Sequence, residues 1–136
     1  MITVVDSLVP RVYLESSRRA GQMRMAWKFI LIETTEALHL VAGPVAEYPY
    51  HANLVSQFCD QNEIPASWEK KPHLVRVFDP GVRIMGGGHI RIDLKLNRMK
   101  LYGRSTAYGS FDLTDVREAV SSDSFFDGFE VFIQGT

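Results

Sequence analysis

The sequence lacks several features that would point to particular classes of protein. It has a single cysteine, Cys59, so no internal disulfide can form. It has no apolar run approaching the roughly 18 to 20 residues that a membrane-spanning helix needs. It also lacks a charge excess, because 15 Lys and Arg residues face 16 Asp and Glu residues. We therefore expect a protein of a reducing compartment such as the cytoplasm, which acts neither in a membrane nor on nucleic acid.

Internal repeats, low-complexity runs and Gly/Ser linkers are absent too. The 136 residues, of which 46% are hydrophobic, are enough for one domain with a real core. The first ten residues lack a basic segment and contain Asp6, so they do not predict a signal peptide. We expect a single domain spanning residues 1–136, and the sequence does not indicate its oligomeric state.

Apolar patterning predicts the elements of this domain. The first half is expected to contain a buried strand over Trp27–Thr34, a hairpin partner over Ala37–Ala42, a helix over Pro49–Gln61 and an irregular loop or flap over Asn62–Pro72. The second half is expected to contain strands at Leu74–Phe78, His89–Lys95, Met99–Arg104 and Phe129–Ile133, with a helix over Leu113–Ser121; residues Val82–Met85 lead into the triple glycine. This order predicts an α/β (α+β) fold, in which two helices cover a mixed sheet of about six strands.

His51 is the strongest candidate for chemistry among the four histidines. It lies in the first turn of the predicted helix, in line with the apolar Val55 and Phe58. The positive end of a helix disfavours an imidazolium, so a neutral ring is expected there, able to act as nucleophile or general base. The same helix end attracts anions such as phosphate. A purely structural histidine is the alternative.

Two glycine-containing segments are candidate anion or close-approach sites. Ser105, Thr106 and Ala107 lie in a turn between Gly103 and Gly109, where several backbone N–H groups can point at one anion. An ordinary strand-to-loop turn explains the same residues. The run Gly86–Gly88 permits either close backbone approach or a bulge where the sheet bends.

Other chemistries find less support in the sequence. His51, His73, His89 and Asp79 show no metal-ligand spacing, so no metal site is expected. Cys59 lies among apolar residues in the predicted helix, which indicates a buried, inert thiol. Basic residues cluster in one hairpin beside two tyrosines and suit an acidic partner or RNA, or simply a solvated face: Arg91, Lys95, Arg98, Lys100 and Arg104.

Taken in order, the segments WKFILI, AEYPYHA, MGGGHIRI, MKLYGRSTAYG and FEVFI resemble the Janus, or protein phosphohistidine phosphatase, family. The resemblance covers nearly the whole chain. It implies a cofactor-free, metal-independent phosphatase that removes phosphate from phosphohistidine on proteins. The family's catalytic histidine falls on His51, its phosphate-binding lysine on Lys28, and its anion loop on residues 105–107.

The chain departs from the family pattern at two positions beside this site. The arginine that follows the family's triple glycine is His89 here, and the tyrosine before the loop serine is Arg104. Arg91, on the same strand face as His89, or Arg104 is expected to supply the missing positive charge. Two functions therefore stand: a phosphohistidine phosphatase, or a binding module that recognises phosphorylated protein, or serves as an assembly subunit, without turnover.

Overall fold

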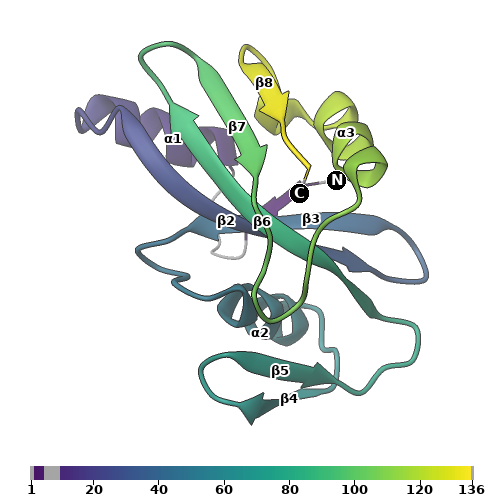
Figure 1. Cartoon of the computed structure of the whole chain (residues 1–136). Coiled ribbons are helices and arrows are strands. Elements are labelled where there is room, and N and C mark those ends of the chain that lie inside the picture. The colour runs from purple at the N-terminus through teal and green to yellow at the C-terminus, as the bar shows by residue number, and fades with distance from the viewer. Residues whose placement is uncertain (1, 5–9, 136) are drawn as a thin grey trace.

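A computed structural model describes residues 2–4 and 10–135 of the chain, with side chains from Leu14 onward (Figure 1). Six strands form one mixed sheet in the order β1-β3-β2-β6-β7-β8. The sheet is antiparallel at its centre and parallel where β1 meets β3 and where β7 meets β8. The strands are β1 (Ile2–Val4), β2 (Arg24–Glu33), β3 (Leu38–Pro44), β6 (Arg83–Asp93), β7 (Arg98–Tyr102) and β8 (Glu130–Ile133). The predicted single α+β domain with a mixed sheet is confirmed.

The central strand β2 shows why both faces of the sheet are covered. Trp27, Phe29 and Leu31 point to one face and are fully buried. Ile30 and Ile32 point to the other face and are also fully buried. Successive side chains along a strand point to opposite faces of the sheet. A strand with apolar side chains on both faces therefore needs a packed layer on each side.

Helices supply these two layers. α1 (Pro10–Arg19) and α3 (Leu113–Ser122) contribute Leu14, Val116 and Ala119 to the core on the Trp27 face. α2 (His51–Gln61) covers the Ile30 face through apolar side chains that include Val55 and Phe58. The described residues thus hold three α-helices rather than the two predicted, and a short 3-10 helix, η1 (Ser124–Phe126), precedes β8. We missed α1 because its sequence, PRVYLESSRR, is mostly polar.

The predicted loop over Asn62–Pro72 is wrong. β4 (Ala66–Lys70) pairs antiparallel with β5 (Leu74–Val77) in a separate two-stranded sheet. This hairpin packs beside α2, where Val75 joins the α2 core (Figure 1). Most side chains of β4 are exposed and polar, so its sequence has the composition of a loop. The start of the helix before it was also predicted too early, at Pro49, since α2 begins at His51 with Tyr50 as its N-cap.

The triple glycine forms a bulge inside one long strand. β6 runs unbroken from Arg83 to Asp93, although the strand was predicted to begin only at His89. Its register with β2 shifts between Ile30 and Ile32, and Gly86 adopts a φ of +92° there. A Cβ on Gly86 would lie 2.0 Å from the Ser110 carbonyl oxygen. The bulge alternative from the sequence is confirmed, and it requires glycine for both reasons.

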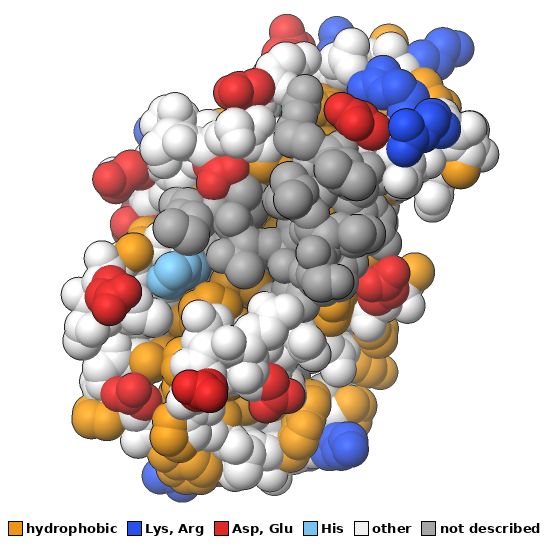
Figure 2. All heavy atoms as spheres, turned by 180° about the vertical axis from the view of Figure 1, so that it is seen from behind, with side chains coloured by type: hydrophobic (Ala, Val, Ile, Leu, Met, Phe, Trp, Pro, Cys, Tyr) orange, Lys and Arg blue, Asp and Glu red, His pale blue; other side chains and the backbone are white. Residues whose placement is uncertain are grey.

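One face of the molecule shows both signs of charge. Seen from behind, carboxylates are scattered across this face, while Lys and Arg side chains form a group at the upper right corner and also occur at the lower edge, without a continuous basic area (Figure 2). Among the described residues, no helix has the length and apolar character needed to span a membrane.

We expect Gly86→Ala to lower the free energy of unfolding by about 2 kcal/mol or more, because alanine is strained at this φ and its Cβ meets the Ser110 carbonyl. Thermal melts of the pure protein measure this change. Gly135→Ala is the matched control, since its Cβ would have its nearest neighbour at 4.0 Å. Equal melting temperatures for the two variants would contradict the assignment of Gly86 as a required glycine.

Candidate functional site

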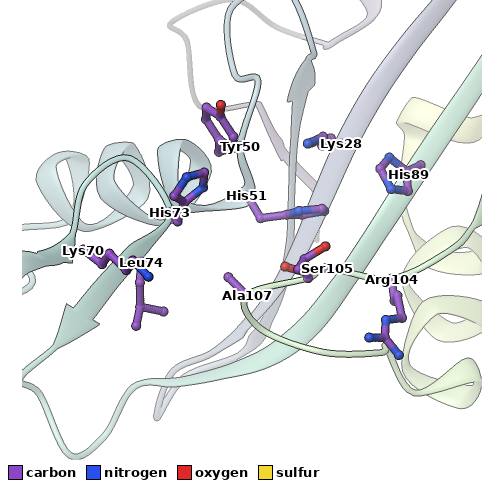
Figure 3. A pocket seen from close by; sticks show the side chains of 11 residues that line it. Lys28, Tyr50, His51, Lys70, His73, Leu74, His89, Arg104, Ser105 and Ala107 are labelled. Atoms are coloured by element: carbon purple, nitrogen blue, oxygen red, sulfur yellow. The ribbon is translucent and has the colours of Figure 1, made fainter.

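A cavity of about 490 Å³ opens beside the start of α2 (Figure 3). Its walls come from β2, β6, the loop after β7 and the β4–β5 hairpin. Eleven residues line it: Lys28, Tyr50, His51, Lys70, His73, Leu74, His89, Arg104, Ser105, Thr106 and Ala107. All but one of the site residues predicted from the sequence thus meet in one pocket, the exception being Arg91.

His51 lies at the inner end of this cavity and is 6% exposed. Its ring approaches the β6 backbone, where Nε2 lies 2.8 Å from the Gly88 carbonyl oxygen. A carbonyl only accepts hydrogen bonds, so Nε2 carries the proton. The neutral ring therefore has its lone pair on the other nitrogen, Nδ1.

The surroundings of His51 keep its ring neutral. Burial lowers the pKa of His51 to about 4, the hydrogen bond to Gly88 raises it, and the nearby Lys28 and His89 lower it further. A shift of this size means that protonation is unfavourable at pH 7. The sequence argument from the helix end gave the right protonation state, but burial is the larger cause.

Lys28 faces His51 from strand β2. In the sheet register it lies directly opposite His89 of β6, so both side chains project from the same face. Its Nζ donates to the Pro49 carbonyl, just before α2, and lies 5.8 Å from the centre of the Tyr50 ring. Burial lowers the pKa of Lys28. The ammonium group is thereby held between the start of the helix and the cavity.

The loop after β7 is closed by its own hydrogen bonds. The amides of Ser105 and Gly109 each donate to the other's carbonyl oxygen, at 3.1 and 2.8 Å, and the Tyr108 amide donates to Ser105 Oγ at 3.1 Å. The Tyr108 hydroxyl accepts from the Val75 amide and anchors the loop to β5. Within the described part of the chain, the amides of Thr106 and Ala107 donate to no protein atom. They are the two N–H groups that this loop leaves for an anion.

His89 occupies the position of the family arginine without its charge. Its ring lies 5.7 Å from the His51 ring and 5.6 Å from the Tyr102 ring. Burial, followed by the charge of Lys28, lowers the pKa of His89, although contact with the Arg104 backbone acts in the opposite sense. A neutral imidazole therefore stands where the family pattern has a guanidinium.

The two arginines expected to compensate differ in position. Arg104 is exposed and lines the cavity, with its side chain turned away from His51 (Figure 3). Arg91 is outside the cavity lining, and its guanidinium lies 5.4 Å from the centre of the Tyr102 ring. Only Arg104 is near enough to turn toward an anion in the pocket.

Sequence reasoning missed the wall that the β4–β5 hairpin contributes. Lys70, His73 and Leu74 face the cavity, and the His73 ring packs edge-on against Tyr50 at 4.8 Å. The charged run Glu69, Lys70 and Lys71 was the available signal, but it was assigned to a loop, which does not predict where its side chains point. With these residues, the lining combines Lys28, Lys70 and Arg104 with three histidines and no carboxylate.

The other chemical candidates lie apart from this arrangement. Asp79 accepts from the Gly81 amide at 2.8 Å in a turn and does not line the cavity. Among the described residues, no group of three or more His, Cys, Asp or Glu side chains is placed to hold a metal ion. Cys59 is buried, and that burial raises its pKa to about 11, so its thiolate is disfavoured.

Comparison with known proteins adds one finding. The family model described as the Janus/Ocnus family matches residues 13–129, which include every residue of the cavity lining. A search of curated proteins finds no match.

We expect the imidazole of His51 to titrate with a midpoint near pH 4, because burial and the neighbouring cations oppose its protonation. Proton NMR of the ring resonances over pH 3.5–8 measures it. Lys28→Met removes one of those cations and is expected to raise the midpoint. Lys95→Met removes an exposed lysine outside the pocket and should leave it unchanged. A midpoint near 6.5 in the wild type would contradict a buried, neutral His51.

Proposed function

The chain belongs to the Janus/Ocnus family, and from this membership and the pocket around His51 we propose that it hydrolyses phosphohistidine on proteins. One observation carries the proposal. A buried, neutral imidazole with its lone pair on Nδ1 shares a cavity with three cationic side chains, two unpaired backbone amides and no carboxylate. Such a cavity suits a dianionic phosphoryl group beside a nucleophile or base.

Binding of the phosphoryl group is assigned to groups whose charge or dipole is already oriented. The Thr106 and Ala107 amides donate to its oxygens from one side, and the Lys28 ammonium approaches from the other. Donors fixed in place before the reaction stabilise developing charge without reorganising. Because Ser105 uses its amide to close the loop, its role is to shape the loop rather than to donate to phosphate.

The reaction itself is assigned to His51 Nδ1. As a nucleophile it forms a bond to phosphorus while the phosphorus–nitrogen bond to the substrate imidazole breaks, and water then releases phosphate from His51. As a general base it takes a proton from water, whose oxygen attacks phosphorus directly while the phosphorus–nitrogen bond breaks and the substrate imidazole leaves. In either case the ring gains positive charge while its Nε2–H remains on the Gly88 carbonyl. Detection of phosphate on His51 by mass spectrometry distinguishes the two routes.

The low pKa of His51 is compatible with phosphohistidine as substrate. The imidazole of the substrate leaves readily once it is protonated, which happens near neutral pH. The attacking group therefore does not need to be a strong base. The neutral ring also stays available in the presence of Lys28, which would repel an imidazolium. Metal coordination is not part of the proposed mechanism.

A second function follows from His89. Since this position carries no charge here, the cation that the family pattern places beside the catalytic histidine is missing, and the side chain of Arg104 is turned away from His51. Transition-state charge is then less well compensated. A protein that binds phosphorylated histidine without turnover would result. Release of inorganic phosphate from a phosphoramidate by the pure protein separates the two functions.

We expect His51→Ala to lower the rate of phosphoramidate hydrolysis by about 100-fold or more, because the lone pair that attacks phosphorus or water is removed. Phosphate release from phosphohistidine measures the rate, and circular dichroism verifies the fold. Cys59→Ala, in the same helix, is the control and should keep most of the activity. If His51→Ala retains near-normal turnover, or Cys59→Ala loses it, the mechanism is wrong.

We also expect Arg104→Ala to lower kcat/KM for a small phosphoramidate about tenfold, the scale of one charge-assisted hydrogen bond. The reason is that Arg104 is the arginine of the cavity lining that can replace the family's guanidinium. Arg24→Ala is the control, since Arg24 lies outside this lining and pairs with Asp93. Equal kinetics for both variants would show that the lost charge is not replaced by Arg104.

A further inference from the structure

The α2 face of the sheet is only half covered. α2 and the β4–β5 hairpin pack on the end that carries Ile30, Ile32 and Val41. Beyond the pocket, the same face continues as rows of residues that lie opposite one another on neighbouring strands. The row that borders the pocket consists of Lys28, His89 and Tyr102.

The next row outward contains two cations without acidic partners. Arg91 and Lys100 lie directly opposite each other, with Ala26 and Phe132 at the two ends of this middle row. In the part of the chain that the structure describes, neither cation forms a salt bridge. Like charges directly opposite on a sheet are destabilising, so this pair is costly in the absence of a ligand.

The outermost row shows what a compensated arrangement looks like on the same strands. Arg24 pairs with Asp93 at 3.7 Å, and Arg98 pairs with Glu130 at 3.4 Å. Every cation of this row therefore has a carboxylate beside it. Among the described residues of these strands, the cations of the outermost row are therefore paired, whereas Arg91 and Lys100 of the middle row are not.

The middle row also offers apolar and aromatic surface. Arg91 and Lys100 lie 5.4 and 5.6 Å from the centre of the Tyr102 ring, and Phe132 is 51% exposed. Beside Arg91, a hollow of about 530 Å³ forms where the small Ala26 leaves room. Tyr102 in turn contacts His89 of the pocket, so the middle row is continuous with the site.

We propose that the middle row, Arg91 and Lys100 with Phe132, binds an acidic segment of the phosphoprotein substrate. This inference rests on the proposed function, and it places carboxylate side chains of the substrate about two to four residues from its phosphohistidine, since adjacent rows are roughly 6.6 Å apart and an extended chain rises about 3.3 Å per residue. The carboxylates supply the partners that Arg91 and Lys100 lack.

An acidic peptide fits this surface better than a nucleic acid does. Binding of RNA or DNA relies on many phosphate contacts along an extended basic stripe. Here two unpaired cations are bordered by the carboxylates of Asp93 and Glu130, which would repel a continuing phosphate backbone. A short segment with a few carboxylates meets the cations and ends before that border.

Fluorescence anisotropy with a labelled Asp/Glu-rich peptide that carries no phosphate tests the surface at low ionic strength. Arg91→Gln combined with Lys100→Gln is expected to raise the Kd about fivefold or more, the scale of two exposed ion pairs. Arg19→Gln combined with Arg117→Gln removes the same net charge from α1 and α3, which cover the opposite face, and should change the Kd by less than about twofold. Because this assay needs no turnover, its failure is distinct from a failure of the proposed function.

Two further measurements complete the test. On addition of the peptide to the wild type, amide resonances of residues 91, 100, 102 and 132 should shift most, which requires no variant to fold. With phosphohistidine peptides, an acidic flank should lower KM in the wild type but not in the Arg91/Lys100 double variant. Three results would overturn the proposal. The first is that both double variants bind the peptide equally weakly, and the second is that the largest resonance shifts occur elsewhere. The third is that the protein binds single-stranded RNA more tightly than the acidic peptide.

Discussion

The hydrogen bond between His51 Nε2 and the Gly88 carbonyl is the constraint on which the site depends. It joins the first residue of α2 to a central strand, and it fixes which ring nitrogen keeps a lone pair. The closeness of the helix depends on Gly87, because a Cβ there would lie 3.2 Å from Cδ2 of the His51 ring and 2.4 Å from the Phe29 carbonyl oxygen of β2. Gly88 is required by the sheet itself, since its Cβ would lie 2.5 Å from the Tyr102 carbonyl oxygen of β7. The glycine run thus serves both the helix contact and the strand packing.

The burial that keeps the His51 ring neutral also links folding to pH. The pKa of His51 is about 4 in the folded chain, against about 6.5 for an unperturbed histidine. Between these values the unfolded chain binds a proton that the folded chain does not. Stability from this group is therefore fully present above pH 6.5 and is lost as the pH falls toward 4. His89, whose pKa is also lowered, contributes in the same direction.

Sequence periodicity was a good guide wherever one face of an element is buried. The alternation in β2 and the helical spacing in α2 predicted both elements, and family resemblance directed attention to Lys28. β4 could not be predicted this way, because its side chains are mostly exposed and its pairing with β5 is a tertiary property. The pocket positions of Lys70 and His73 were missed for the same reason. The Ser105 amide was predicted to donate to an anion, but it donates to the Gly109 carbonyl oxygen and so closes the loop. The sequence does not indicate which amides of a turn are used within the turn.

The substitution at His89 makes physical sense once the sheet face is considered as a whole. Lys28 lies opposite this position on β2, and Arg91 follows two residues along the same face of β6, itself opposite Lys100. An arginine at position 89 would add a fourth cation to this group and increase the like-charge repulsion across the strands. A neutral imidazole instead packs between the rings of His51 and Tyr102, at 5.7 and 5.6 Å. The chain therefore has a neutral ring beside His51 and keeps the unpaired cations Arg91 and Lys100 just outside the pocket, where the proposed acidic segment would meet them.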